Sequence, residues 1–242
     1  MIEINQLSIN NKNSKLTSNL NITFKQGEFW AILGKNGTGK TTLLHTMAGL
    51  LKYNSGNIKI DNNELAGISP LNRAQNIALL SQIMETGLDC TVEQSITYGR
   101  YPWNKFKLNA EIEKSLIETA INKMQLNDLR HKSIQEISGG ELRKVEIATI
   151  LAQNSGVLML DEPLNHLDLS FRYVLMNLLK QLSEKKLIIM VTHDIQYVKS
   201  YCSNVLFLLN NGQYIYGKTK NMMTKNNINK MLEINLPENI LL

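Results

Sequence analysis

Gly34-Lys35-Asn36-Gly37-Thr38-Gly39-Lys40-Thr41 is the stretch that decides the fold. It consists of a glycine, four further residues and then Gly-Lys-Thr, a pattern whose glycines let backbone N–H groups turn toward a polyphosphate. Lys40 is predicted to reach the outer phosphates, and the hydroxyl of Thr41 is predicted to bind Mg2+. A helix that begins here points the positive end of its dipole at the anion. The octet therefore predicts a site for the phosphates of a nucleotide.

The residues on either side of the octet supply the strand and the helix that the pattern needs. Phe29-Trp30-Ala31-Ile32-Leu33 is a short apolar run, typical of a buried strand in a parallel sheet. After the octet, apolar residues recur at helical spacing, at Leu44, Met47, Ala48 and Leu51. The alternative is a surface turn that happens to contain Gly and Lys. A strand before the loop and a helix after it argue against that alternative.

Length and composition indicate an ordinary globular protein. The chain has 242 residues, of which 43% are hydrophobic and 19% are charged. No apolar run approaches the roughly 18–20 residues of a membrane helix, and the first residues lack the pattern of a signal peptide. We therefore expect the chain to stay in the compartment where it is made. The net charge of +5 comes from scattered lysines, so nucleic acid is not required, and an anionic membrane face or an acidic partner would fit equally well.

The cysteines and histidines carry no metal-binding pattern. Cys90 and Cys202 are far apart in the sequence and belong to no CxxC motif, and the four histidines lack the spacing of metal ligands. A reducing cytosol suits both observations.

Strand and helix patterns alternate at both ends of the chain, and the middle is helical. Short alternations in residues 1–27 predict antiparallel strands, and Asn211-Gly212 predicts a hairpin near the end. Buried strands separated by helices, including the run at residues 187–191, predict a parallel sheet with covered faces. From about residue 83 to 154, a capping box at Thr91 and Gln94 and an apolar stripe predict helices. The stripe consists of Ile112, Leu116, Ile117, Ala120, Ile121 and Met124.

Two adjacent carboxylates follow a buried strand at residues 157–160. Asp161 and Glu162 thus lie at the carboxyl end of a strand, where parallel sheets bind ligands. Phosphoryl chemistry suggests that Asp161 holds Mg2+, often through water, and that Glu162 polarises the attacking water. The alternative is an acidic strand end exposed at a loop. Upstream, Ser138-Gly139-Gly140-Glu141 opens a helix, and these residues taken alone favour a helix cap and an anion site equally.

The order of these motifs resembles that of the ATP-binding subunits of ABC transporters over essentially the whole chain. The segments that carry the resemblance are residues 34–41, Gln82, residues 138–141, 159–162, 167–168 and 192–194. The resemblance implies an α/β fold: a P-loop NTPase (RecA-like) core with an antiparallel β subdomain and an inserted helical subdomain. It implies one domain over residues 1–242, with the core at about 1–82 and 155–242 and the helical subdomain at about 83–154.

The family's activity is ATP hydrolysis, with ATP and Mg2+ as the ligands that the resemblance implies. Two copies would sandwich two ATP molecules, each bound by the phosphate loop of one chain and the Ser-Gly-Gly signature of the other. Gln82 would sense Mg2+ and water, His193 would contact the γ-phosphate, and Asp168 would lie at the dimer seam. Carried over in this way, the catalytic residues are Glu162, His193 and Gln82, the metal ligands are Thr41, Gln82 and Asp161, and the nucleotide contacts outside the loop are Ser138, Gly139, Gly140, Glu141 and Asp168.

The segment Tyr98-Gly99-Arg100-Tyr101-Pro102-Trp103 points to one branch of the family. It resembles the Gly-Arg-x-Pro-Trp segment of ATPases that energise uptake of iron-siderophore complexes, haem and cobalamin. The alternative makes Trp103 a core aromatic and Pro102 a helix stop. In importers this region contacts a coupling helix of the permease, so an exposed aromatic patch here would be a docking surface. The resemblance thus implies a peripheral protein on the cytoplasmic face of the membrane, bound to an integral membrane permease. A periplasmic or lipoprotein substrate-binding protein would be an indirect partner, and nucleic acid would not be a partner.

The chain departs from the family pattern at two places. Residues 10–14 contain no aromatic side chain, whereas family members commonly stack adenine on one there, so the pattern does not predict selectivity against GTP. The signature ends in Glu141 where the family usually has Gln, and the added negative charge near the nucleotide is expected to weaken closure. Two other functions stay open from the sequence: a soluble ABC ATPase of cofactor assembly, and the ATPase subunit of an exporter.

Overall fold

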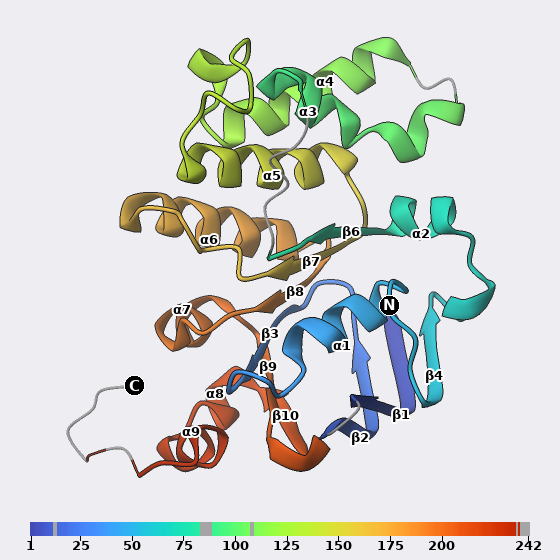
Figure 1. Cartoon of the computed structure of the whole chain (residues 1–242), viewed down its shortest axis with the longest axis vertical. Helices are drawn as coiled ribbons and strands as arrows, with labels where there is room; N and C mark the ends of the chain where they lie inside the picture. The colour runs from blue at the N-terminus through green and yellow to red at the C-terminus, as the bar shows by residue number, and fades with distance from the viewer. Residues whose placement is uncertain (12–13, 83–88, 107–108, 236, 238–242) are drawn as a thin grey trace. The chain divides into compact units, whose positions relative to one another are not determined.

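The computed structural model describes residues 1–11, 14–82, 89–106, 109–235 and 237. The chain forms two compact units, Met1–Ile68 together with Met176–Leu242, and Ser69–Leu175. Figure 1 labels their helices and strands. The helical segment expected over about residues 83–154 falls inside the second unit, and its first six residues, 83–88, lie outside the described residues.

An antiparallel sheet opens the first unit, which confirms the strands predicted in residues 1–27. Its order is β2-β1-β4-β5. The strands are β1 (Ile2–Asn11), β2 (Ser14–Phe24), β4 (Ser55–Ile60) and β5 (Asn63–Glu64). Ile2 and Ile4 of β1 lie opposite Phe24 and Ile22 of β2, and all four side chains are buried. One face of this sheet therefore belongs to the core of the unit.

The phosphate loop follows the central strand of a second sheet in the same unit. This strand, β3 (Phe29–Gly34), pairs in parallel with β8 (Leu187–Val191) and β9 (Asn204–Leu208). β10 (Tyr214–Lys218) pairs antiparallel with β9, so the order within the unit is β10-β9-β3-β8. Every residue of β3, β8 and β9 is buried. The predicted buried parallel strands are thereby confirmed.

The remaining elements of the first unit are short helices and turns. They are α1 (Lys40–Met47), α7 (Ile195–Tyr201), α8 (Thr219–Met222), α9 (Lys225–Leu232) and the 3-10 helices η1 (Leu65–Gly67) and η4 (Asn210–Gly212). The predicted hairpin turn joins β9 to β10, with φ of 57° at Asn211 and 73° at Gly212. Glycine and asparagine are the residues that adopt such values at least cost.

Helix α1 is shorter than its apolar spacing predicts. It buries Leu44 and Met47 completely but ends at Met47. Gly49 has φ of 74°, a left-handed conformation that ends a right-handed helix. Leu51 therefore lies beyond the helix and is 44% exposed, so the prediction was wrong for this residue.

The second unit combines two parallel strands with a group of helices. β6 (Ile77–Leu80) pairs with β7 (Val157–Asp161). The helices are α2 (Pro70–Asn76), α3 (Val92–Tyr98), η2 (Tyr101–Phe106), α4 (Ala110–Lys123), η3 (Asn127–Leu129) and α5 (Gly139–Gln153), while α6 (Leu169–Ser183) contains the boundary between the units. Figure 1 shows α3, α4 and α5 packed side by side. Most of the described middle segment is helical, as predicted, but residues 130–137 between η3 and α5 form turns and bends.

Two details of these helices test the sequence patterns. The capping box before α3 is confirmed, because Thr91 Oγ1 accepts from the Gln94 N–H and the Thr91 N–H donates to Gln94 Oε1. The apolar stripe on α4 was wrong at its first residue, Ile112, which is 57% exposed. Burial is complete only toward the end of the helix, at residues such as Ile121 and Met124. The packed face of α4 therefore starts after its first turn.

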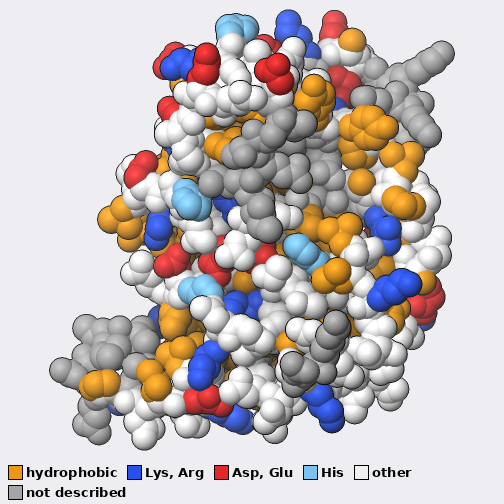
Figure 2. Space-filling model, viewed as in Figure 1, with side chains coloured by type: hydrophobic (Ala, Val, Ile, Leu, Met, Phe, Trp, Pro, Cys, Tyr) orange, Lys and Arg blue, Asp and Glu red, His pale blue; other side chains and the backbone are white. Residues whose placement is uncertain are grey.

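The surface carries mixed charges and the thiols are inside. Acidic and basic side chains are interspersed on the face shown in Figure 2. Among the described residues, no helix combines the length and the apolar character that crossing a bilayer requires.

Cys90 and Cys202 are free and buried, and burial raises the pKa of both thiols. Neither is therefore a reactive thiolate.

Candidate active site

The phosphate loop connects β3 to α1 and depends on its glycines. Gly39, at the N-terminus of α1, has φ of 93°, and a Cβ there would lie 2.8 Å from Leu16 Cβ. A Cβ at Gly34 would lie 2.6 Å from Thr38 Oγ1 and 2.7 Å from a backbone oxygen of β9. Both positions therefore require glycine, for the backbone conformation at Gly39 and for space at Gly34.

Lys40 places its ammonium against the backbone of this loop. Its Nζ donates to the carbonyl oxygens of Gly34 at 2.9 Å and Lys35 at 3.0 Å, and the side chain is 7% exposed. Within the described residues no side chain caps the N-terminus of α1, and the first turn of the helix contains no acidic residue. A buried cation beside uncapped helix N–H groups suits an anion.

His193 belongs to the same unit and follows the strand next to β3. β8 ends at Val191, opposite Ile32 of β3, and the Thr192 N–H donates to the Ile32 carbonyl at 3.4 Å. His193 is exposed. The first unit therefore brings His193 to the sheet edge at which the phosphate loop begins.

The second unit carries Gln82 and the two carboxylates at one edge of its strand pair. Leu80 of β6 lies opposite Leu160 of β7, so Gln82 and Glu162 each lie two residues beyond a paired position. Asp161 is fully buried, and neither of its carboxylate oxygens has a hydrogen-bond partner among the described residues. Glu162 is 5% exposed and has φ of 47°. A buried carboxylate without a partner is costly, which indicates a site for a cation.

The signature residues start helix α5. Ser138 is its N-cap and accepts from the Glu141 N–H, while the Glu141 carboxylate accepts from the Ser138 N–H at 2.8 Å and hydroxyl at 2.7 Å. The hydrogen bonds from the Ser138 backbone and hydroxyl lower the pKa of Glu141. Ser138 and Gly139 are exposed. The predicted helix start is confirmed, and the charge of Glu141 is used in the cap.

Gly140 packs the signature against the segment before α6, where Asp168 caps the first turn of that helix. A Cβ at Gly140 would lie 2.8 Å from the His166 carbonyl oxygen, so only glycine fits there. Asp168 is exposed, and its carboxylate accepts from the Ser170 hydroxyl at 2.6 Å and the Phe171 N–H at 2.8 Å. The hydrogen bond from Ser170, followed by that from Phe171, lowers the pKa of Asp168.

The aromatic segment after α3 divides into an anchored part and an exposed part. Trp103 donates from Nε1 to the Gln153 carbonyl at 2.8 Å, and the Arg100 guanidinium lies 5.4 Å from its ring centroid. Tyr98 and Tyr101 are 55% and 72% exposed. The expected exposed aromatic surface is therefore formed by these tyrosines, with Trp103 turned toward α5.

A hollow of about 280 Å³ lies beside Tyr98 in the second unit. Its lining comes from β6, α3 and α5 and is mainly apolar, with Leu142 and Val145 among its residues. In the first unit, Asn10, Ser14 and Lys15 line an open hollow with Asn211, and residues 12–13 lie outside the described residues.

Sequence reasoning missed Arg143, a buried residue of α5 that touches both strand ends of the second unit. Its signal in the sequence was a pair of basic residues, Arg143 and Lys144, between the apolar residues Leu142 and Val145 of a helix. A charge at such a position needs several partners, but the sequence does not say which ones.

Comparison with known proteins agrees with this geometry. The family described as ABC transporter matches residues 17–165, more than half of the chain. The chain belongs to the ABC transporter family. The solved structure of cbiO1 from Clostridium perfringens, part of the ABC transporter complex cbiONQ, superposes with a TM-score of 0.76 at 28% identity, over 98% of this chain and 95% of cbiO1. The fold is accordingly the α/β fold of ABC ATPases, with a P-loop NTPase core.

Two relatives from Bacillus subtilis (strain 168) place the chain among the ATP-binding proteins of the family. The uncharacterized ABC transporter ATP-binding protein YvrA is 37% identical over 201 residues, which are 81% of this chain and 46% of YvrA. The chain thus spans about half the length of YvrA. The petrobactin import ATP-binding protein YclP is 30% identical over 240 residues, which are 98% of this chain and 94% of YclP. This ABC protein is therefore an ATP-binding one.

The side chains available as metal ligands suit Mg2+ rather than a metal that is coordinated by protein side chains alone. The described residues contain no group of three or more His, Cys, Asp and Glu side chains. Mg2+ is usually held by one or two carboxylates, a hydroxyl, water and the phosphates of its substrate. The buried oxygens of Asp161 fit that chemistry, and the Thr41 hydroxyl and the Gln82 amide are donors of the same hard type.

Proposed function

We propose that this ABC protein is the ATP-hydrolysing subunit of an importer for iron-siderophore complexes or, in the same class of cargo, haem or cobalamin. The observation that carries the ATPase function is the buried Lys40 ammonium on the carbonyls of the glycine loop, in a chain of the ABC family. Support for import comes from residues 98–103 and from YclP, a petrobactin import protein that matches nearly the whole chain.

The phosphates of ATP are bound by residues 34–41. Gly34, Gly37 and Gly39 have no side chain that would keep the ligand from the backbone, so the N–H groups of the loop face the ligand. Lys40 exchanges a contact with a loop carbonyl for one with the outer phosphates. Lys35, Asn36 and Thr38 complete the loop, and the dipole of α1 adds to the positive potential.

Hydrolysis uses the polar residues at the strand ends. Thr41, Gln82 and Asp161, the last often through water, would hold Mg2+, which would supply positive charge against the phosphate oxygens. Glu162 polarises the attacking water and accepts its proton. His193 donates a hydrogen bond to the γ-phosphate.

A second copy of the chain completes each nucleotide site. Ser138, Gly139 and Gly140 lie at the N-terminus of a 15-residue helix, where the helix dipole and the N–H groups of the first turn attract the partner's γ-phosphate. The exposure of Ser138 and Gly139 supports this contact. Asp168 lies at the seam of the dimer, and Glu141 stays in its cap, where its charge weakens closure.

The membrane partner is an integral permease that docks on the second unit. The exposed rings of Tyr98 and Tyr101 beside the apolar hollow offer a surface for a short permease helix. The protein is then peripheral, on the cytoplasmic face of the membrane, and a periplasmic or lipoprotein substrate-binding protein delivers cargo to the permease from the other side. No nucleic acid takes part.

The ATPase proposal is tested with two variants of the purified protein. Lys40→Ala abolishes binding of Mg-ATP, whereas Lys59→Ala, which removes the same charge from a half-buried position on β4, leaves the Kd unchanged. Glu162→Gln binds ATP with the parent's Kd, but turnover falls by about a hundredfold or more and the protein stays an ATP-bound dimer. Equal turnover by Glu162→Gln and the parent would refute the role of Glu162.

Import is tested by copurification from the native membrane. A multi-spanning membrane protein is expected with the parent and is lost with Tyr98→Ala/Tyr101→Ala, a double variant that keeps the ATPase activity. A parent purified without any membrane protein favours a soluble ATPase of cofactor assembly. Growth on single iron sources then separates import from export, because loss of an importer subunit abolishes growth on its cargo.

A further inference from the structure

Arg143 makes a fork of four hydrogen bonds inside the second unit. Its Nη2 donates to the carbonyl oxygens of Asp161 at 2.8 Å and Glu162 at 2.9 Å. Its Nη1 donates to the carbonyl oxygen of Ser81 and to Glu146 Oε2, both at 2.9 Å. The side chain is 1% exposed. One planar group therefore joins α5 to the ends of β6 and β7.

The Glu162 backbone has a conformation that needs such support. Its φ of 47° lies in the left-handed region, which is unfavourable for a residue with a long side chain. Two successive carbonyl groups, of Asp161 and Glu162, converge on one nitrogen of Arg143. This convergence fixes the peptide between them, and the peptide sets the direction in which the Glu162 side chain leaves the chain.

The same guanidinium reaches the residue before Gln82. Ser81 follows Leu80, whose partner across the strand pair is Leu160. The hydrogen bond from Arg143 to the Ser81 carbonyl therefore spans the two strand ends at the level where Gln82 and Glu162 leave them. Both residues are the ones proposed to handle the attacking water.

The arginine is not placed where stability alone would favour it. Its Nε–H is buried and has no acceptor in the described part of the chain. A buried charge with an unpaired donor is costly. Lysine could not replace it, because one ammonium cannot meet three carbonyls in a plane as the guanidinium fork does.

We propose that Arg143 is a positioning residue for ATP hydrolysis, which holds the Glu162 peptide in its left-handed conformation and fixes the Ser81 strand end beside it. The inference rests on the proposed ATPase function. The guanidinium is occupied by protein groups, so Arg143 acts on kcat through Glu162 and leaves nucleotide binding alone.

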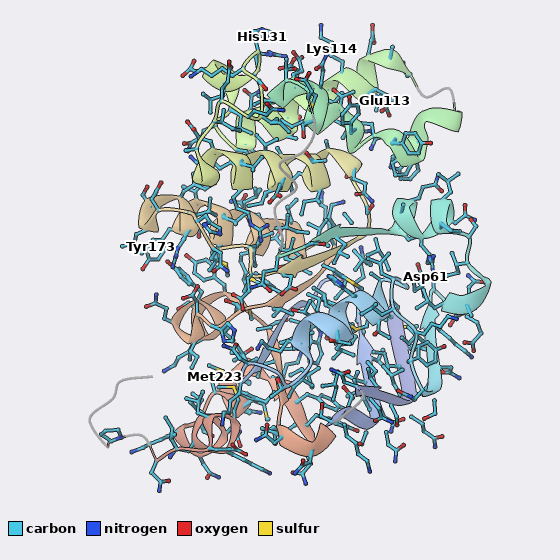
Figure 3. All side chains as sticks on the ribbon, viewed as in Figure 1. Asp61, Glu113, Lys114, His131, Tyr173 and Met223 are labelled. Carbon is cyan, nitrogen blue, oxygen red and sulfur yellow. The ribbon has the colours of Figure 1, made fainter. Side chains whose placement is uncertain are left out.

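Arg100 supplies a matched control at the other end of α5. It is 4% exposed, and its Nη1 donates to the carbonyls of Ala152 and Gln153, both at 2.9 Å. Its Nε and Nη2 bind the carboxylate of Glu113 on α4, which Figure 3 labels. Arg100 thus has partners of the same kinds as Arg143, with two carbonyls in place of three and one glutamate, away from the strand ends.

The experiment compares Arg143→Lys with Arg100→Lys in the purified protein. Both variants lower the melting temperature. In Arg143→Lys, kcat falls by about tenfold to a hundredfold while the Kd and KM for Mg-ATP stay within about twofold; in Arg100→Lys, kcat stays within about twofold. Adding Arg143→Lys to Glu162→Gln causes no further loss of turnover, because the positioned carboxylate is already gone.

Three results would overturn the proposal: parent kcat in a folded Arg143→Lys variant, an equal loss of kcat in Arg100→Lys, or a full additional loss in the Glu162→Gln background. If Arg143→Lys does not fold, Glu146→Gln is used instead. This variant removes the carboxylate partner of Arg143 but keeps the guanidinium and its three hydrogen bonds to carbonyl groups. It is expected to lower kcat by about threefold with unchanged Kd, and an unchanged kcat counts against the proposal. If the parent protein binds no ATP or shows no turnover, that result refutes the proposed ATPase function itself.

Discussion

Replacing Asp161 by Asn should stabilise the protein when no nucleotide is present. The carboxylate is fully buried, and both of its oxygens lack a partner among the described residues. Leaving a buried polar group unsatisfied costs about 1–3 kcal/mol, and more when it is charged. A neutral amide of the same shape removes the charge, so we expect a gain of about 1–3 kcal/mol, or about 2–12 °C in melting temperature for a chain of this size.

The assay is thermal unfolding of both proteins with and without Mg-ATP. Without ligand, Asp161→Asn melts at a higher temperature than the parent; with Mg-ATP, only the parent gains stability, because the variant has lost its charged Mg2+ ligand. Asp168→Asn is the control, since it changes the net charge equally at an exposed carboxylate that keeps its Ser170 and Phe171 hydrogen bonds as an amide. Its melting temperature should not rise. A ligand-free Asp161→Asn protein that melts below the parent refutes the reasoning.

Three further predictions concern other parts of the chain. Gly99→Ala should destabilise by about 1–3 kcal/mol in urea, because its Cβ would lie 2.2 Å from a carbonyl oxygen of α5, whereas Gly156→Ala, with nothing within 4 Å, should not. Glu141→Ala should have a lower melting temperature than the parent at pH 7. Because the pKa of Glu141 is lowered in the folded protein, the difference in melting temperature should vanish as the pH falls from 4.5 through that pKa. A difference that stays constant with pH would contradict a stabilising role of the Glu141 carboxylate in the capping box. Glu233→Gln should tighten ATP binding by about two- to fivefold at low salt. Glu233 forms an ion pair with Lys35 of the phosphate loop at 2.8 Å, and its removal leaves the charge of Lys35 to the phosphates. An unchanged Kd by calorimetry would contradict this prediction.

Local patterns could be predicted from the sequence because neighbouring residues alone produce them. The capping box at Thr91 and the helix start at Ser138 need only residues within one turn of the chain. The glycine loop likewise sits between a strand and a helix that its flanks specify. For the same reason, residues 1–27 and the buried strands of the first unit were predicted correctly.

The features that were missed depend on contacts between distant segments or on one backbone angle. Arg143 donates to carbonyl groups that lie 62 and 18 residues away in the sequence. The periodic spacing of apolar residues does not predict contacts between such distant segments. The pair of Lys35 and Glu233 spans 198 residues. Leu51 was misplaced because Gly49 ends the helix in a left-handed conformation, which helical spacing does not reveal. The roles of the individual site residues stay predictions.

The claim that two copies share each nucleotide is tested most directly by sedimentation of Glu162→Gln at micromolar protein. With millimolar Mg-ATP the account predicts a particle of twice the 27.5 kDa chain mass, and with Mg-ADP a single chain. A variant that binds ATP but sediments as a single chain, while the parent hydrolyses ATP at a rate per chain that does not change with protein concentration, would contradict it.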